Sequence, residues 1–138
     1  MTDTLDQKLV NAGLALLAAD PGLTVYDGFV PPNSPRPYVL VYTSVEWVPA
    51  PGDGLDGAST SPVVRWYCHC VGETATAARA VAQRVRTQLL DQRPVIPSAP
   101  TMTLGLVRFE SGVPPVKDET TGVLVMDTVT VYKLAANT

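Results

Sequence analysis

Two hydrophobic patterns follow one another directly in the middle of the chain. Residues 63–71 are rich in β-branched and aromatic side chains, which predicts a strand. Gly72 ends this run, and the side chain of Thr74 is suited to cap a helix. No Gly or Pro follows until after Leu90, and the apolar residues there recur at helical spacing: Ala78, Val81, Val85 and Leu89. The pattern predicts a strand that leads into a helix, whose apolar stripe packs on a sheet.

The N-terminal segment also has helical spacing. Thr4 and Gln7 match a capping box, which predicts that a helix begins here. It is expected to run to about Ala19 and to end at the sequence Asp-Pro-Gly, with an apolar stripe of Leu5, Leu9, Ala12 and Leu16. Leu14 falls almost opposite this stripe. It is either one exposed leucine, which is common, or part of a second contact face for a neighbouring subunit.

Other segments have strand character. Residues 24–26 form a short predicted strand, and the near-continuous apolar run 38–43 predicts a strand that is buried on both faces. Apolar and polar residues alternate over residues 102–110, and strong β-formers are concentrated in residues 123–134. Residues 135–138 are expected to form a short tail. The order α-β-β-β-α-β-β predicts a single α+β domain over residues 1–138, in which two helices pack on a mostly antiparallel sheet of four to five strands.

A long connection is predicted over residues 45–61, and it holds Trp47, Asp53 and Asp56. A loop of this length in a compact domain is usually functional or disordered. The two aspartates lie three residues apart in a glycine-rich run, which has too few oxygen ligands for a helix–loop–helix calcium site. We therefore expect a turn-rich loop here, with Trp47, Asp53 and Asp56 available to a partner.

Residues 111–122 are predicted to form a charged turn between two strong strands. The turn contains Lys117, Asp118 and Glu119. A solvated hairpin tip is the ordinary interpretation, and contact with an adjacent subunit of a ring is the alternative.

Composition narrows the classes of function. With 138 residues, 46% hydrophobic residues, a net charge of −3 and a pI of about 4.9, the chain is typical of one globular domain. A dedicated nucleic-acid binder would need a clustered basic surface. No apolar run approaches the ~20 residues that span a bilayer, so we expect no membrane partner. The chain also starts without a basic–apolar–small leader pattern, which favours the cytosolic side of synthesis.

The sequence Cys68-His69-Cys70 invites a metal interpretation, which strand geometry opposes. Residues 68 and 70 share one face of a strand and residue 69 points to the other, so the three side chains cannot converge on one ion. The chain has no further His or Cys to complete a tetrahedral site. We therefore expect two buried, unbridged cysteines, with no metal and no cofactor.

Candidate catalytic groups are few. His69 is the single histidine, and no nucleophile-elbow, phosphate-loop or dinucleotide glycine motif is present. We therefore expect that the protein is not an enzyme, because an enzyme needs convergent titratable groups. A small-ligand-binding or enzymatic α+β domain remains the alternative from another class.

Arg79, Gln83 and Arg86 form a polar row along one flank of the second predicted helix. Such a row is either solvated, with its stems lying over the edge of the core, or in contact with phosphate or a partner's carboxylates.

Taken together, the segments resemble the small tail-terminator, or tail-completion, proteins of long-tailed bacteriophages and related gene-transfer particles. The resemblance covers nearly the whole chain and rests on residues 18–22, 37–42, 54–59, 65–90 and 118–132. These are a helix with an Asp-Pro stop, a Pro-Tyr-Val strand, a Gly-Leu-Asp-Gly-Ala-Ser loop, the central strand and helix, and an acidic turn before a Val-x-Val-Tyr strand.

The resemblance implies a structural virion protein that is assembled in the host cytoplasm. It implies a homo-oligomeric ring, commonly a hexamer, that caps the tail tube and offers a surface to the head connector, while DNA passes through the lumen without specific binding. The near alternative is another head–tail connector or stopper component.

Overall fold

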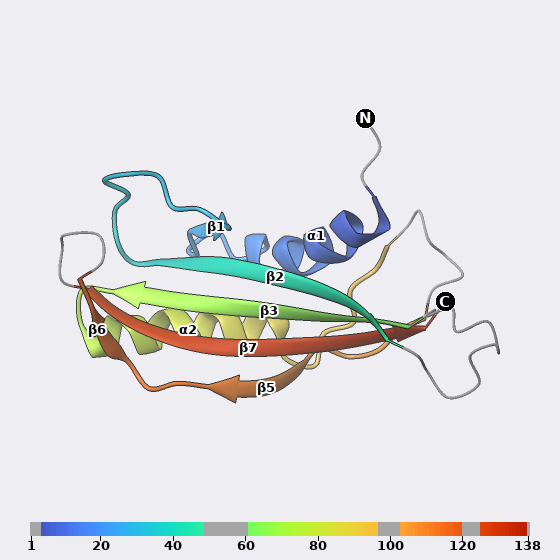
Figure 1. The fold of residues 1–138 in the computed structure, drawn as a ribbon. Coiled ribbons are helices and arrows are strands. Elements are labelled where there is room, and N and C mark those ends of the chain that lie inside the picture. Colours follow the sequence, from blue (N-terminus) through green and yellow to red (C-terminus); the bar gives the residue numbers. More distant parts are fainter. Residues whose placement is uncertain (1–3, 49–60, 97–102, 120–124, 138) are drawn as a thin grey trace.

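In the computed structural model, the described residues are 4–48, 61–96, 103–119 and 125–137. They form two helices and seven strands in one sheet (Figure 1). The helices are α1 (Leu5–Ala18) and α2 (Ala75–Leu89). The strands are β1 (Val25–Asp27), β2 (Tyr38–Val48), β3 (Ser61–Gly72), β4 (Thr103–Leu104), β5 (Arg108–Gly112), β6 (Val116–Asp118) and β7 (Val125–Asn137).

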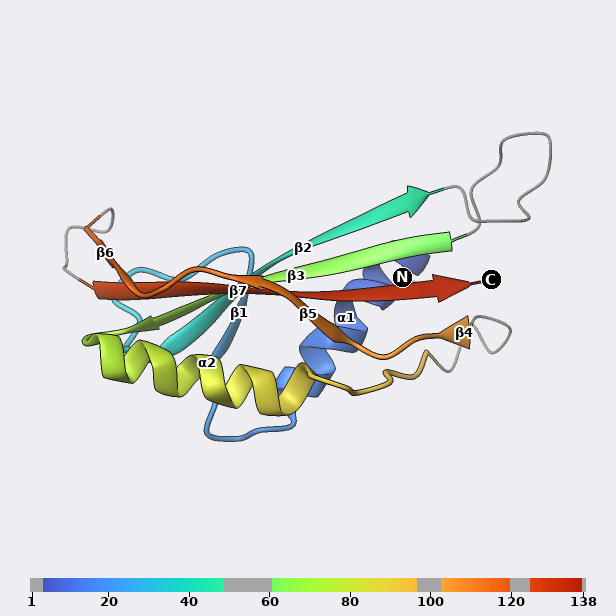
Figure 2. The ribbon, with the colours of Figure 1, turned by 90° about the horizontal axis from the view of Figure 1, so that it is seen from below.

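Three long strands form the centre of the sheet. β2 pairs with β3 and β3 pairs with β7, both antiparallel, and the short β1 runs parallel to β2 at one edge. At the other side, β4, β5 and β6 each pair with a different part of β7. Figure 2 shows α1 and α2 beneath the same face of this sheet, while no helix covers the opposite face. The predicted α+β fold with a mostly antiparallel sheet is confirmed.

The core lies between the helices and the sheet because alternate strand residues turn toward the helices. On β3, Trp66 is fully buried and faces Tyr132 of β7 in the strand register. The predicted stripe of α2 is confirmed, since its four residues are the buried residues of that helix. Both predicted caps also form: Thr4 accepts from the Gln7 N–H and Thr74 from the Ala77 N–H. Among the described residues, neither helix is long and apolar enough to cross a membrane.

Helix α1 buries a different stripe from the predicted one. Its fully buried positions are Leu9, Gly13 and Leu17, an i, i+4, i+8 row. Gly13 lies against Trp66, and a Cβ at residue 13 would come within 2.2 Å of that ring. Leu14 is partly buried and packs against the core, so it is not the freely exposed leucine of the first interpretation. Its contact with a neighbouring subunit stays a prediction. The predicted stripe was based on the spacing of the leucines. The close contact between α1 and the sheet is instead made by Gly13, which has no side chain.

Strand β2 differs from the prediction in two ways. Both faces are covered only at its start, where Val39 and Val41 lie in the core and Tyr38 is buried in a second apolar cluster on the other face; farther along, that second face opens, and Tyr42 is 46% exposed. The strand also continues to Val48, so residues 45–48 are not part of a loop. Trp47 pairs with Pro62 in the strand register, packs against the core and donates its indole N–H to Asp6 at 2.9 Å. Residues 49–60, with Asp53 and Asp56, lie outside the described residues.

The C-terminal third is more divided than predicted. The predicted strand 102–110 breaks around Val107, which turns into the core and exchanges backbone hydrogen bonds of 2.8 Å with residues 91 and 92. The predicted turn 111–122 contains a strand, β6, which pairs with the start of β7. The expected tail is part of β7 as far as Asn137. The strand breaks at Val107 because its backbone bonds to residues 91 and 92, whereas β7 is long enough to pair with β4, β5 and β6 in turn.

Candidate functional site

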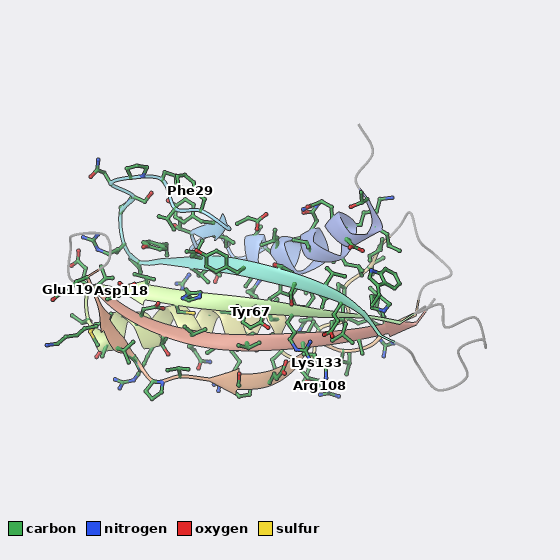
Figure 3. All side chains as sticks on the ribbon, viewed as in Figure 1. Phe29, Tyr67, Arg108, Asp118, Glu119 and Lys133 are labelled. Atoms are coloured by element: carbon green, nitrogen blue, oxygen red, sulfur yellow. The ribbon has the colours of Figure 1, made fainter. Side chains whose placement is uncertain are left out.

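The face of the sheet that carries no helix offers a broad surface, seen from the front in Figure 3. We call it the helix-free face. It is formed by alternate residues of the long strands, namely Leu40, Tyr42, Ser44 and Glu46 of β2, Val63, Arg65, Tyr67 and His69 of β3, and Val129, Val131, Lys133 and Ala135 of β7. It combines aromatic rings with charged groups, a composition typical of protein contact surfaces.

A charged row crosses this face. Arg65 donates to Glu46 at 3.1 Å and to Glu110 at 3.0 and 3.3 Å, which links β2, β3 and β5. The bond to Glu110 raises the pKa of Arg65, so the guanidinium stays charged. Lys133 lies between Arg65 and Arg108 in the strand register, and Arg108 pairs with Asp91. Positive and negative groups are nearly balanced in this row. It therefore offers paired polar groups to a partner and produces only a weak electrostatic potential.

The edge formed by β5 and β6 is a second candidate surface. Both strands pair with β7 on one side, and no described strand pairs with them on the other (Figure 2). Three large apolar side chains near this edge are about half exposed: Phe109 at 50%, Val113 at 51% and Val116 at 52%. An unpaired edge that carries exposed apolar residues is a site at which another chain can add.

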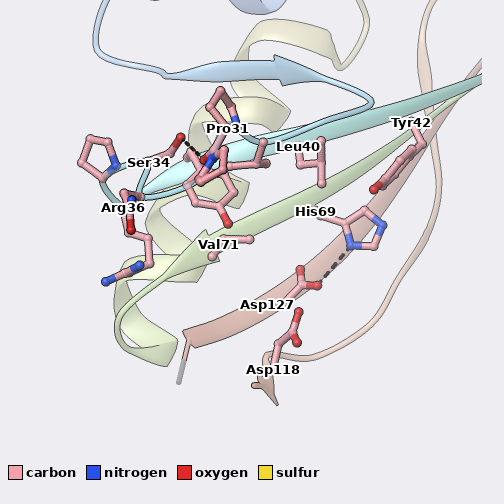
Figure 4. A pocket seen from close by; sticks show the side chains of 14 residues that line it. Pro31, Ser34, Arg36, Leu40, Tyr42, His69, Val71, Asp118 and Asp127 are labelled. Atoms are coloured by element: carbon pink, nitrogen blue, oxygen red, sulfur yellow. Dashed lines mark hydrogen bonds and ion pairs between the residues drawn. The ribbon is translucent and has the colours of Figure 1, made fainter. Parts of the chain in front are cut away.

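A cavity of about 810 Å³ lies at one end of the helix-free face, where the loop 30–36 covers it. Figure 4 shows His69, Asp127 and Asp118 along one side of this cavity, with Pro31 and Arg36 of the loop on the other. The apolar part of the wall includes Leu40 and Val71. Of these polar groups, only His69 and Asp118 were singled out from the sequence, and for separate reasons.

His69 and Asp127 form a partly buried pair. His69 Nδ1 lies 3.1 Å from Asp127 Oδ2, and the Tyr42 ring lies edge-on to the imidazole with centroids 5.4 Å apart. The bond to Asp127 raises the pKa of His69; burial opposes this change, and the charges of Asp127 and Asp118 add to it. The hydroxyl of Ser34, which also lines the cavity, donates to the Pro31 carbonyl at 2.6 Å. His69 and Asp127 thus resemble the base and the orienting carboxylate of a catalytic triad. Ser34 does not complete one here, because its hydroxyl is bonded to the Pro31 carbonyl of its own loop.

The predicted polar row on α2 lies at the surface, as Arg79, Gln83 and Arg86 are all exposed. Arg86 donates to Gln83 at 2.8 Å. Together with Phe109 and Tyr132, these residues line a shallow cavity of about 220 Å³ between α2 and the β5 side of the sheet. The row therefore adjoins the β5–β6 edge.

The two cysteines lie as strand geometry predicts. Cys68 and Cys70 are buried, unbridged and on the helix-covered face, while His69 points to the other face. Burial raises the pKa of both thiols, that of Cys70 to about 12, so both stay protonated and unreactive. Within the described part of the chain, no group of three or more His, Cys, Asp or Glu side chains could hold a metal ion.

The remaining predicted contact residues are dispersed. Lys117 and Glu119 are exposed at the end of β6, where Figure 3 labels Glu119 beside Asp118. Trp47 and Leu14 lie against the core on the helix-covered face. The structure thus brings Asp118 to the cavity and the α2 row to the β5–β6 edge, and it does not join these two groups into one site.

This chain matches one family model and resembles a solved structure. The family model described as tail completion protein gp17 matches residues 8–130. Among solved structures, a chain of the virion of a native gene transfer agent particle has the same fold, with a TM-score of 0.65 and 18% sequence identity over 97% of this chain and 95% of that chain. The comparison with curated proteins gave no match. Because the family model covers most of its length, the chain belongs to the tail completion protein gp17 family.

Proposed function

We propose that this protein is a structural subunit of a phage tail that closes into a ring on the end of the tail tube. The ring ends tube growth and offers a surface to the head connector, as a tail terminator does. Membership of the tail completion family supports a structural tail protein. The fold shared with a chain of the gene transfer agent virion supports a place in the particle.

The observation that carries the ring is the β5–β6 edge. No described strand pairs with the outer side of this edge, and Phe109, Val113 and Val116 there are each about half accessible to solvent. A free edge of this kind is completed when a second copy adds to it. We propose that the adjacent subunit contributes its opposite side, near β1, where Phe29 is 67% exposed. Contacts between two different surfaces are heterologous, and they close into a ring when the rotation between copies allows it.

The low charge of the subunit suits this role. A net charge of −3 disfavours strong binding of DNA by the ring, which is consistent with DNA sliding through its lumen. The helix-free face, with its aromatic and paired polar groups, is then available for contact with the tail tube or the head connector.

Substitution at the edge tests the proposal. Val113 is held through its backbone, since its N–H donates to the Val129 carbonyl and its carbonyl accepts from Thr128, while its side chain points to solvent. Val113→Asp should therefore leave the melting temperature almost unchanged and prevent ring formation. Val95→Asp is the matched control, because Val95 is 77% exposed and belongs to neither β5 nor β6.

Native mass spectrometry and light scattering supply the measurement. The wild type, alone or after addition of purified tail tubes, should form a species of about six times the 14.7 kDa subunit mass. The Val95→Asp protein should do the same, and the Val113→Asp protein should stay monomeric and fail to stop tube growth. A wild type that stays monomeric even with tubes would overturn the ring. A Val113→Asp protein that still forms it would overturn the assigned edge.

A further inference from the structure

We propose that the cavity under the loop 30–36 binds the side chain of an arginine or lysine from an adjoining protein chain. The aliphatic stem would lie along the apolar wall, and the cationic head would lie at Asp118 and Asp127. The binding chemistry does not depend on ring formation, so the failure of this proposal and the failure of the proposed function are distinguishable.

The shape of the cavity fits a long side chain together with its backbone. Its volume of about 810 Å³ is within the ~300–1,000 Å³ of drug-sized ligand sites, and it exceeds what one side chain fills. One wall is apolar, with Leu40, Val71 and the ring of Tyr42, and the acids lie beyond it (Figure 4). Arginine and lysine combine an apolar stem with a charged head and bury the stem along surfaces of this kind.

The acidic side of the cavity is built by the register of two strands. Val116 pairs with Asp127 and Asp118 pairs with Val125, so the two aspartates are diagonal neighbours on one face of β6 and β7. Asp127 Oδ2 is occupied by His69, whereas Asp127 Oδ1 is buried and has no hydrogen-bond partner among the described residues. A buried carboxylate oxygen without a donor is costly, and an incoming guanidinium or ammonium group would supply the donor.

The charges around the cavity favour a cation over an anion. Arg36 is the one cation in the described lining apart from His69, and its guanidinium pairs with Glu73 at 3.7 Å. Figure 4 shows Arg36 on the far side of the cavity from Asp118 and Asp127. With His69 neutral, the Asp127 carboxylate makes the inner end negative. An anionic ligand would add a further negative charge there.

The position of the cavity favours a protein side chain over a free amine. The cavity opens on the helix-free face beside exposed Tyr42, the surface that we propose is covered on assembly. Its excess volume also leaves room for the residues that flank an inserted arginine or lysine.

The single histidine makes the proposal measurable in the intact protein. His69 is the only histidine of the chain, so its ring resonances are unambiguous in an NMR spectrum. N-acetyl-arginine N-methylamide should shift these resonances in a saturable manner. The citrulline analogue, which has the same shape without the charge, should bind at least about tenfold more weakly.

Two variants test whether the guanidinium of the probe binds at the two aspartates. Asp127→Asn and Asp118→Asn should each weaken binding of the arginine probe about tenfold or more, while the melting temperature and the remaining spectrum show an intact fold. Glu73→Gln is the control, because Glu73 pairs with Arg36 at the rim. It should leave the affinity for the probe within about twofold of wild type.

The pH dependence of probe binding provides an independent test. His69 is faced by Tyr42 from β2, Asp127 from β7 and Asp118 from β6, with Arg36 on the loop side of the cavity. Protonated His69 neutralises the carboxylate that the probe needs, so affinity should fall as the pH decreases through the pKa of His69. By linkage, the bound arginine probe should lower the pKa of His69.

Several results would overturn the proposal. These are the absence of any shift with the arginine probe, an equal effect of the citrulline analogue, or unchanged affinity in both aspartate variants. Agmatine tests the source, because it carries the same guanidinium and stem without peptide groups. If agmatine binds and the peptide form does not, the cavity takes a free amine and the side-chain proposal is wrong.

Discussion

The two faces of one sheet differ in what they contribute. Along β3, Trp66 is fully buried beneath α1, whereas the neighbouring Arg65 lies on the helix-free face with its guanidinium between two glutamates. The same strand therefore supplies the centre of the core and part of a polar surface, one residue apart. This difference shows that the two helices complete only one side of the sheet. On the other side no helix covers the sheet, and we propose that this side contacts a partner.

The comparison predicts where substitutions act. Residues on the helix-covered face should control the free energy of unfolding, because they exclude water from the core. Residues on the helix-free face and the β5–β6 edge should control association, because their side chains reach solvent in the single chain.

The largest effect is expected for Val85→Asp. Val85 is fully buried beneath α2, and an aspartate there would be a buried charge without a partner. The variant should fail to fold cooperatively, as judged by circular dichroism and urea unfolding. Ala80→Asp is the control on the same helix, because Ala80 is exposed, and it should change the unfolding free energy by about 0.5 kcal/mol or less. A Val85→Asp protein that melts cooperatively would contradict the assignment of the core.

An intermediate effect is expected for Gly13→Ala. In an exposed helix interior this substitution stabilises by about 1 kcal/mol. At residue 13 the new methyl group meets the Trp66 ring, so the variant should be destabilised by about 1–3 kcal/mol. Ala15→Gly, at an exposed position of the same helix, should cost about 1 kcal/mol through helix propensity alone. Urea unfolding measures both, and a stabilised Gly13→Ala protein would show that Trp66 has room to move.

Sequence periodicity predicted the parts of the fold in which each residue acts through its own size and polarity. The stripe of α2, the strand that precedes it and the caps at Thr4 and Thr74 are all found as predicted. Periodicity gave wrong predictions where the burial of a residue depends on a contact with a residue far away in the sequence. Gly13 is important because Trp66 fills the space beside it, and Val107 is buried because the backbone turns toward residues 91 and 92.

The candidate sites were less predictable than the fold, for the same reason. Trp47 was placed in a loop because prolines follow it, although Ser44 to Trp47 alternate as a strand does. Asp127 was overlooked, although a charged residue within a strong strand is a signal in its own right. Its role depends on register, because β7 places it beside Asp118 on one side and within reach of His69 on the other.

The smallest effect concerns the pH dependence of stability, and it tests whether the helix-free face contributes to the fold at all. The bond to Asp127 raises the pKa of His69 above its ordinary value of 6.5, so the folded state favours the protonated ring. This stabilisation is complete at pH values below the pKa of the unfolded chain. It is lost as the pH rises through the higher pKa of the folded state.

The difference in unfolding free energy between the wild type and His69→Gln should therefore be larger near about pH 5.5 than near about pH 8.5. Other groups that titrate in this interval cancel in the difference, because both proteins contain them. The same comparison in an Asp127→Asn background should lose its pH dependence, since the carboxylate is the main cause of the raised pKa. If the difference instead grew toward high pH, burial would outweigh the bond to Asp127. The helix-free face would then oppose a charge at this position, and its polar groups would serve partners alone.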